Sequence, residues 1–278
     1  MLLEKTLHHA FPARADGCFT LDADSGSITV GPGEGDEIQV DVTVATQALD
    51  EAVARELQES VVVEFLTTGT GPLVRSRAAK AERSAWNFWR RKGQVELTFA
   101  VTIPYRQDLV INSVAGDVEI TRIQGNVRVY LGAGAIHVGA VTGRVSVETG
   151  SGPIEVRQVG ERVIARSNAG NIKLLQIGDA IEVTTGAGEV SAEIVRQPTT
   201  DSRITTSTGG VSIDLAETVG LYLDATTRIG GVMTRPPSAV RASPLGGSIC
   251  APINGGGPRL TVRTDVGEVF VRSFSRLD

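Results

Sequence analysis

Residues 145–192 read VSVETGSGPIEVRQVGERVIARSNAGNIKLLQIGDAIEVTTGAGEVSA, and this stretch decides the fold. Glycines recur in it every 18 residues, and an aliphatic residue stands two positions after each of them. Between these positions apolar and polar residues alternate, which is the period of a β-strand. Val145, Val147 and Thr149 are therefore predicted to share one face of a strand.

The same register extends beyond this stretch in four columns of residues. The columns are Gly116, Gly134, Gly152, Gly170 and Gly188; Val118, Ile136, Ile154, Ile172 and Val190; Leu109, Val127, Val145, Val163 and Ile181; and Ile123, Val141, Val159 and Ile177. A fixed period of this kind indicates a solenoid, in which each unit buries its apolar face against the next copy. We predict an all-β fold, a single-stranded parallel β-helix or β-solenoid with two-arm coils of about 18 residues.

Each predicted coil consists of two short strands joined by tight corners. After the corner, Ile154 and Val156 point inwards, and residues 18 apart stack at the strand spacing of about 4.8 Å. The corner glycine is expected to adopt a positive φ, so that a bulky residue at Gly152 would strain the corner. A left-handed hexapeptide helix would require an aliphatic residue at every sixth position, and the series Leu109, Ala115, Thr121 does not provide it.

The repeat continues with irregular spacing on both sides. Gly209, Gly230, Gly246 and Gly267 lie in similar contexts, and SGSITV around Gly26 resembles a first copy. The insertion from Arg196 to Ser202 is expected to bulge from a corner without breaking the stack.

We predict one domain over residues 1–278, with one short helix in an N-terminal insertion. Its parts are first strands and a cap (1–46), a helix plus a basic aromatic hairpin (47–94), and the repeat coils (95–278). Leu49, Val53 and Leu57 fall on one face at helical spacing, and this helix is expected to cover an end or a side of the solenoid. Strands are expected at Val61–Thr68 and Gln94–Pro104.

The segment Ser76–Lys92, SRAAKAERSAWNFWRRK, is the most distinctive chemical feature. Seven basic residues and one acidic residue lie from Arg75 to Lys92, whereas the chain as a whole carries a net charge of −5. Aromatic and arginine side chains together are typical of interfaces. The segment either packs back on the solenoid, which is the favoured interpretation, or docks a protein or contacts a membrane surface; nucleic-acid binding is the least favoured alternative, because it rests on one short basic patch. The candidate partner-binding residues are Trp86, Phe88, Trp89, Arg90, Arg91 and Lys92.

The sequence predicts no catalytic, metal or cofactor site. The outward column Glu119, His137, Glu155 is the one candidate for acid–base chemistry, and a solvated ladder of alternating charge is the favoured interpretation. His8 and His9 are expected at the surface. The two cysteines, Cys18 and Cys250, are expected to be free thiols, with a disulfide between them as the alternative.

The net negative charge gives no general attraction to nucleic acid or to anionic membranes. The first residues, MLLEKTLHHAFPARADG, hold no apolar stretch of the length of a signal peptide, and no run approaches the roughly 18 apolar residues of a membrane helix. A cytoplasmic location is therefore expected, or an envelope-associated one if a leader is missing.

The xGxVxV units, the SGSITV copy and the passage VELTFAVTIP–DLVINSVAGDVEI resemble the DUF4097 family of bacterial adhesin-type β-strand-repeat proteins. The resemblance covers roughly residues 19–49 and 95–272. Members resemble adhesin heads and the toastrack domains found beside regulators of envelope stress. The resemblance implies no catalytic residues.

Together these features predict a non-enzymatic interaction module, adhesin-like or associated with envelope stress, that presents flat β-ladders to another protein or to itself. No nucleic acid, cofactor or small-molecule substrate is expected. One alternative is a self-assembling filament of the bactofilin type, which requires an uncapped solenoid end. A less favoured alternative is a carbohydrate-active enzyme that uses Glu119 and Glu155.

Overall fold

The computed structural model describes the chain except residues 15–16, 79–92, 105, 236–239, 243–245 and 275–278. It divides into two compact units. The first unit comprises Met1–Gly125 and Val129–Gly132, and the second comprises Asn126–Arg128 and Ala133–Asp278. Strand β10 (Val127–Ala133) contributes residues to both.

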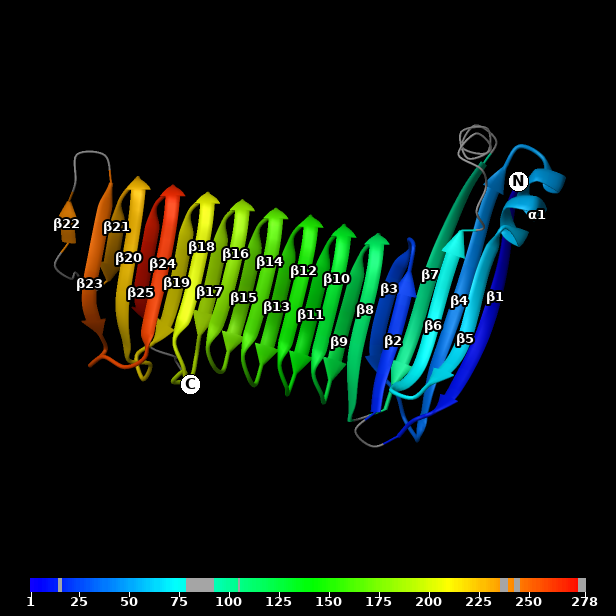
Figure 1. The fold of residues 1–278 in the computed structure, drawn as a ribbon, viewed down its shortest axis with the longest axis horizontal. Helices are drawn as coiled ribbons and strands as arrows, with labels where there is room; N and C mark the ends of the chain where they lie inside the picture. Colours follow the sequence, from blue (N-terminus) through cyan, green and yellow to red (C-terminus); the bar gives the residue numbers. More distant parts are fainter. Residues whose placement is uncertain (15–16, 79–92, 105, 236–239, 243–245, 275–278) are drawn as a thin grey trace. The chain divides into compact units, whose positions relative to one another are not determined.

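The regular part of the second unit confirms the predicted two-arm solenoid, because successive strands alternate between two sheets (Figure 1). Sheet A contains β11 (Ile136–Val141), β13 (Ile154–Val159), β15 (Ile172–Ile177), β17 (Val190–Ile194) and β19 (Val211–Ala216). Sheet B contains β12 (Val145–Ser151), β14 (Val163–Ala169), β16 (Ile181–Ala187) and β18 (Ser202–Thr208). The strands of each sheet pair in parallel, and Ile136, Ile154 and Ile172 lie in register as predicted.

The inner rows of both sheets form an aliphatic core. Val145 and Val147 from sheet B and Ile154 and Val156 from sheet A are fully buried. Aromatic residues make up only 4% of the chain, so stacked valine, isoleucine and leucine side chains provide most of this burial. The intervening residues point outwards, as the alternation predicts.

The corner glycines bring successive coils into backbone contact. Gly152 has a φ of +134°, and a Cβ on it would lie 2.0 Å from the carbonyl oxygen of Gly134. Its N–H donates to the carbonyl of Ala169 at 2.9 Å. Only glycine satisfies both demands, a left-handed φ and the absence of a side chain.

A buried hydroxyl three residues before each of several corners bonds to the glycine of the preceding coil. Thr149, Ser167 and Thr185 donate to the carbonyl oxygens of Gly134, Gly152 and Gly170, at 3.5, 3.4 and 3.3 Å. These side chains lie in the inner row, where an unpaired polar group would be costly. At these three corners the sequence Ser/Thr-x-x-Gly therefore adds one coil-to-coil hydrogen bond to the glycine contact.

The insertion between β17 and β18 leaves the stack intact, as expected. Strands β16 and β18 still pair in parallel although the spacing has grown to 21 residues. The loop is tied to neighbouring coils by hydrogen bonds from Arg196 to Gly160 and from Thr199 to Asp179. Burial alone would raise the pKa of Asp179, but the hydrogen bonds from Thr199 lower it below its ordinary value.

The last coil in the sequence lies inside the stack of the second unit. Strands β24 (Arg259–Val266) and β25 (Val269–Phe274) stand between β18 and β19 on one side and β20 (Leu221–Ile229) and β21 (Val232–Arg235) on the other. In Figure 1 the red pair lies between the yellow and orange ones. The corner glycines accordingly stack in the order Gly188, Gly209, Gly267, Gly230.

One glycine departs from the prediction that the repeat continues through Gly209, Gly230, Gly246 and Gly267. Gly246 is no corner, because β23 (Gly247–Ile253) runs antiparallel to β20, and β22 (Val240–Ala242) runs antiparallel to β23. The chain then passes over the start of β20 to reach β24. Asn254, with a φ of +49°, holds this turn by donating to the carbonyls of Ala216 and Val219.

The first unit has the same two layers with antiparallel strands at one end. Its part of sheet A runs β1 (Leu2–Pro12), β4 (Glu37–Ala48), β7 (Gly93–Ile103), β3 (Ser27–Pro32) and β9 (Val118–Ile123). Its part of sheet B runs β5 (Val61–Thr68), β6 (Gly71–Ala78), β2 (Gly17–Ala23) and β8 (Gln107–Ala115). SGSITV is a first copy as predicted, because Gly26 donates its N–H to Ala115 and lies against Gly116.

The predicted helix is α1 (Glu51–Glu59), which packs on β1 and β4. Asp50 caps it by accepting the N–H of Ala52 at 3.0 Å. Leu57 is buried and Val53 partly so, but the placement of Leu49 on this face is wrong, since its side chain is 96% exposed. The cap at Asp50 starts the helix after Leu49. No helix of the described residues is long and apolar enough to cross a membrane.

The buried hydroxyls allow a matched test. Thr185→Val keeps the shape but removes the hydrogen bond to Gly170, so the free energy of unfolding should fall by about 1 kcal/mol. The Thr206 hydroxyl is buried in the same column without a hydrogen bond among the described atoms, so Thr206→Val should leave stability unchanged or raise it. Urea denaturation followed by circular dichroism measures both, and equal losses would contradict the role of the bond.

Candidate functional site

The predicted docking residues, Trp86, Phe88, Trp89, Arg90, Arg91 and Lys92, lie outside the described residues. Of the predicted hairpin only Ser76–Ala78 belongs to a described strand, at the end of β6. The docking role of this segment stays a prediction.

The outer face of sheet A holds the predicted acid–base column. His137 and Glu155 lie in register on β11 and β13, with 3.9 Å between His137 Nδ1 and Glu155 Oε2. Arg157 donates its Nε–H to Glu155 Oε1 at 2.6 Å, so this carboxylate already has a cationic partner. Glu119 belongs to the first unit and is exposed. The pair in the second unit therefore forms part of a solvated charge ladder, as favoured from the sequence.

The outer face of sheet B carries a strip of arginines in the second unit. Arg162 and Arg166 both bind Glu182, at 2.9 and 2.5 Å. The next residue in this row is Arg203, which lies in register between Glu182 and Thr261 and is exposed. Among the described residues no carboxylate lies within ion-pair distance of Arg203. Its guanidinium group is thus available to an outside acid.

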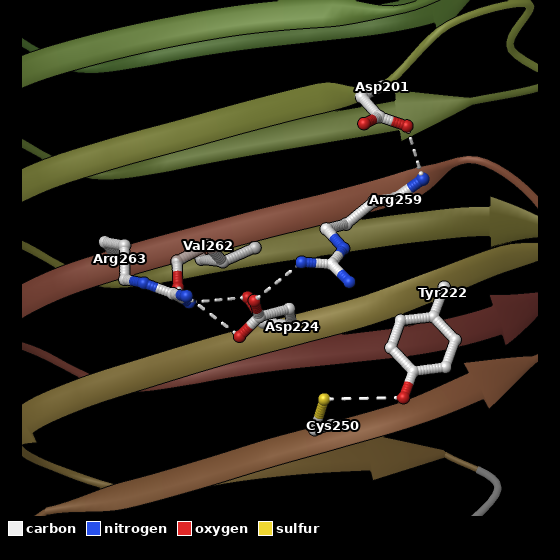
Figure 2. A network of polar contacts seen from close by, with 7 residues as sticks. All are labelled: Asp201, Tyr222, Asp224, Cys250, Arg259, Val262 and Arg263. Carbon is white, nitrogen blue, oxygen red and sulfur yellow. Dashed lines mark hydrogen bonds and ion pairs between the residues drawn. The ribbon is translucent and has the colours of Figure 1, made fainter.

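The same face continues into a polar network centred on Asp224, drawn in Figure 2. Arg263 donates to the Asp224 carboxylate at 2.9 Å and to its backbone carbonyl at 2.7 Å. Arg259 Nη1 approaches the other carboxylate oxygen at 3.8 Å, and the backbone N–H of Arg259 donates to Asp201 at 2.8 Å. The inserted strand β24 is therefore linked to β20 on one side and to the turn before β18 on the other.

Tyr222 and Cys250 lie beside this network (Figure 2). The Cys250 thiol is 3.5 Å from the Tyr222 hydroxyl, and this hydrogen bond is the main cause that raises the pKa of Tyr222 above its ordinary value. The Arg259 guanidinium lies over the tyrosine ring, 5.7 Å from its centroid. Cys18 and Cys250 are both free thiols, as expected from the sequence.

The face between these arginines is lined with hydroxyls in rows along the stack. The outward positions of β16, β18 and β24 include Thr184, Thr205 and Thr261, and all three side chains are at least partly exposed. Parallel strands fixed by a packed core hold such groups at the regular strand spacing. This arrangement can bind an extended acidic segment through arginine–carboxylate pairs and hydroxyl hydrogen bonds.

The sequence pattern did not identify this face, because its arginines do not recur with the 18-residue period and the inserted coil brings Arg259 and Arg263 to it from far along the chain. The one signal in the sequence that could have indicated this face is the set of arginines in the inserted coil, each of which needs an acidic partner. Arg259 and Arg263 both point outwards on β24, on either side of Thr261. Arg272 on β25 binds Asp214 on β19, with 2.8 Å between Arg272 Nη2 and Asp214 Oδ2. Each arginine of the inserted coil meets an acid on a flanking strand or turn.

The described residues contain no group of three histidine, cysteine, aspartate or glutamate side chains placed to hold a metal ion. Two carboxylates of the outer face of sheet B, Glu182 and Asp224, are each engaged by two arginines, and a third, Glu148, lies in register with Arg166. The chemistry of this face is therefore ion pairing and hydrogen bonding.

Stacked two-arm coils with glycine corners define the class as a toastrack-type β-solenoid. The Toastrack DUF4097 family matches residues 18–236, and the chain belongs to this family.

Three solved structures of similar proteins cover nearly the whole chain. A "putative cell adhesion protein" from Clostridium sporogenes is 9% identical, with a TM-score of 0.31 and 98% of this chain and 100% of that chain covered. A "putative adhesin" from Bacteroides fragilis is 12% identical, with a TM-score of 0.38 and 97% of each chain covered. A "putative lipid binding protein" from Parabacteroides distasonis is 12% identical, with a TM-score of 0.40 and coverages of 97% and 96%. No curated protein matches the sequence.

The Asp224 network should stabilise the inserted coil. Asp224→Asn leaves the charges of Arg259 and Arg263 uncompensated, and we expect a loss of about 1 kcal/mol in the free energy of unfolding. Glu161→Gln is the control, because it removes the exposed pair with Arg144 and should change stability by less than about 0.5 kcal/mol. Chemical denaturation of both variants checks the difference, and an equal effect would refute this role of the network.

Proposed function

We propose that this protein is a non-enzymatic interaction module that binds an acidic, extended segment of another protein on the outer face of sheet B in the second unit. The observation that carries the proposal is the arginine strip of this face. It comprises five arginines, Arg162, Arg166, Arg203, Arg259 and Arg263, on a chain with a net charge of −5. The five arginines outnumber Glu182 and Asp224, the two acids that four of them bind, and a local excess of positive charge directs acidic partners to one surface.

The rigidity of the face supports the same function. Its residues lie on strands whose inner rows are buried, so a partner would order few groups of this protein on binding. Arg203 is the central contact in the proposal, because Glu182 beside it already binds two other arginines and its other neighbour, Thr261, carries no charge. The proposal is compatible with both an adhesin-like module and an envelope-stress-associated scaffold.

The engaged carboxylates argue against the carbohydrate-active alternative. A glycosidase needs two carboxyl groups that flank the sugar bond, one of which donates a proton. Glu155 is bound by Arg157, and Glu182 and Asp224 are each bound by two arginines. Each of these carboxylates is held by arginine in an ion pair, an arrangement that suits a structural role.

Binding of a fluorescent peptide tests the proposal. A 12-residue peptide of alternating glutamate and threonine should bind the wild type at low salt and lose affinity as salt is added. Arg203→Glu should weaken binding by about tenfold or more. Lys173→Glu makes the same change in net charge on the opposite sheet and should leave binding within about twofold. Fluorescence anisotropy measures each affinity.

The proposal would be rejected if the wild type did not bind, or if Arg203→Glu and Lys173→Glu weakened binding equally. Trp86→Ala/Trp89→Ala in the same assay separates the arginine face from the predicted docking segment. A loss of binding in this variant alone would move the docking site to residues 86–92.

A further inference from the structure

The inserted coil, residues 259–274, fills a slot between two other coils of the second unit (Figure 1). Its strand β24 pairs with β18 along one edge and with β20 along the other, and β25 pairs with β19 and β21 in the same way. The inner rows of the coil are fully buried, at Leu260 and Val262 on β24 and at Val269 and Val271 on β25. The slot is therefore a binding surface with two strand edges and an apolar interior.

Polar contacts tie the inserted coil to the flanking coils. Arg263 donates to the Asp224 carboxylate at 2.9 Å, and the Thr227 hydroxyl donates to the carbonyl oxygen of Gly267 at 2.8 Å. Both contacts join residues about 40 positions apart in the sequence. They depend on the coil lying in the slot, and they do not depend on which chain supplies it.

A short hinge, residues 254–258 with the sequence NGGGP, joins β23 to the inserted coil. Three of its residues have a left-handed backbone in this structure, with φ values of +49° at Asn254, +89° at Gly255 and +85° at Gly256. Glycine adopts extended conformations equally well, so the hinge is suited to opening.

The closed hinge follows a tight path past Gly220, the residue before β20. A Cβ on Gly257 would lie 2.2 Å from the carbonyl oxygen of Gly220, and a Cβ on Gly220 would lie 2.3 Å from that of Gly256. Gln197 also holds Gly220, because its side-chain amide bonds to the backbone N–H and to the carbonyl of Gly220, both at 2.9 Å. The return of the chain to its own slot is thus sterically constrained.

We propose that the slot of one copy accepts the inserted coil of a second copy, so that two chains form an exchanged dimer. Every contact between coil and slot is kept in such a dimer, and only the hinge takes a new path. The hinge spans two strand spacings, roughly 10 Å, in the closed chain. When extended it reaches roughly 20 Å, which is enough to pass to a neighbouring copy. A short, constrained hinge favours exchange of this kind.

Exchange would build the outer face of sheet B from two chains. Arg162, Arg166 and Arg203 would come from one chain, and Arg259 and Arg263 from the other. The dimer would then hold two arginine faces together through its two hinges, so that it could bind two acidic segments at once. This consequence rests on the proposed function, whereas the exchange itself does not, and its tests use no ligand.

Hinge length tests the proposal in the full chain. Deletion of residues 255–257 leaves a reach of roughly 10 Å between Ile253 and Arg259, which is too short to cross two strand spacings and pass Gly220 as well. Light scattering should therefore show a dimer for this variant. Insertion of Gly-Ser-Gly after Gly256 is the matched control and should give a monomer, because the longer hinge closes freely. A monomeric deletion variant would overturn the proposal.

Cross-chain disulfides test the exchange with the native hinge. In a chain with Cys18→Ser and Cys250→Ser, one variant carries Ser212→Cys on β19 and another carries Phe270→Cys on β25, which are neighbours in the sheet. After the two variants are refolded together at increasing protein concentration and oxidised, mass spectrometry should find a rising yield of disulfide between chains. This measurement stays decisive if the deletion variant does not fold.

The control pair joins two strands outside the inserted coil. Ser191→Cys on β17 and Ser212→Cys on β19 are also neighbours, but exchange leaves both in the chain that made them. Placed on separate chains, this pair should give no disulfide between chains. No cross-chain disulfide between Ser212→Cys and Phe270→Cys, or equal yields for the two pairs, would show that the slot takes only its own coil.

Discussion

The contact between corner glycines is the constraint on which the stack depends. At Gly152 the carbonyl oxygen of the preceding corner occupies the place of a side chain, and Gly170 and Gly188 repeat the arrangement. This contact fixes the register at every coil, so the aliphatic columns meet with like residues above one another. It also explains why the insertion lies in the turn between β17 and β18, at the opposite end of the coil from the glycine corner. A 21-residue coil is accommodated because only the loop lengthens, while Gly209 still stacks on Gly188.

The ion pairs of the inserted coil favour one order of the coils, which the corner contact alone leaves open. Gly230 and Gly267 both have a positive φ and both lie against the carbonyl of a neighbouring corner glycine. The inserted coil differs by its arginines, which meet Asp224 on one side and Asp214 on the other. If β20 paired directly with β18, the inserted coil would not lie between them, and its arginines could not meet Asp224 on one side and Asp214 on the other. Partly exposed ion pairs contribute little individually, but several acting on one coil can decide between two arrangements of similar packing.

Local repetition made the regular coils predictable, and its loss limited the prediction elsewhere. The 18-residue period sufficed for the two-arm coil, the positive φ at Gly152 and the inward face of Thr149, because each depends on nearest neighbours alone. The position of the C-terminal coil depends on pairing between residues about 58 apart, such as Asp214 and Arg272, which no period encodes. Gly246 shows the same limit, since its sequence context resembles a corner but its strand runs antiparallel. The arginine face was missed for this reason too.

Disulfide cross-linking on sheet A tests the coil order most directly. Ser212, Phe270 and Met233 lie in one outward row of β19, β25 and β21. In a chain with Cys18→Ser and Cys250→Ser, the pair Ser212→Cys/Phe270→Cys should form a disulfide, since neighbouring strands lie about 4.8 Å apart. The pair Ser212→Cys/Met233→Cys should not, because two strand spacings exceed the roughly 7 Å limit for a disulfide. Mass spectrometry of the oxidised proteins distinguishes them. Efficient cross-linking of Ser212→Cys with Met233→Cys, and none with Phe270→Cys, would show that the coils stack in sequence order and would contradict this account.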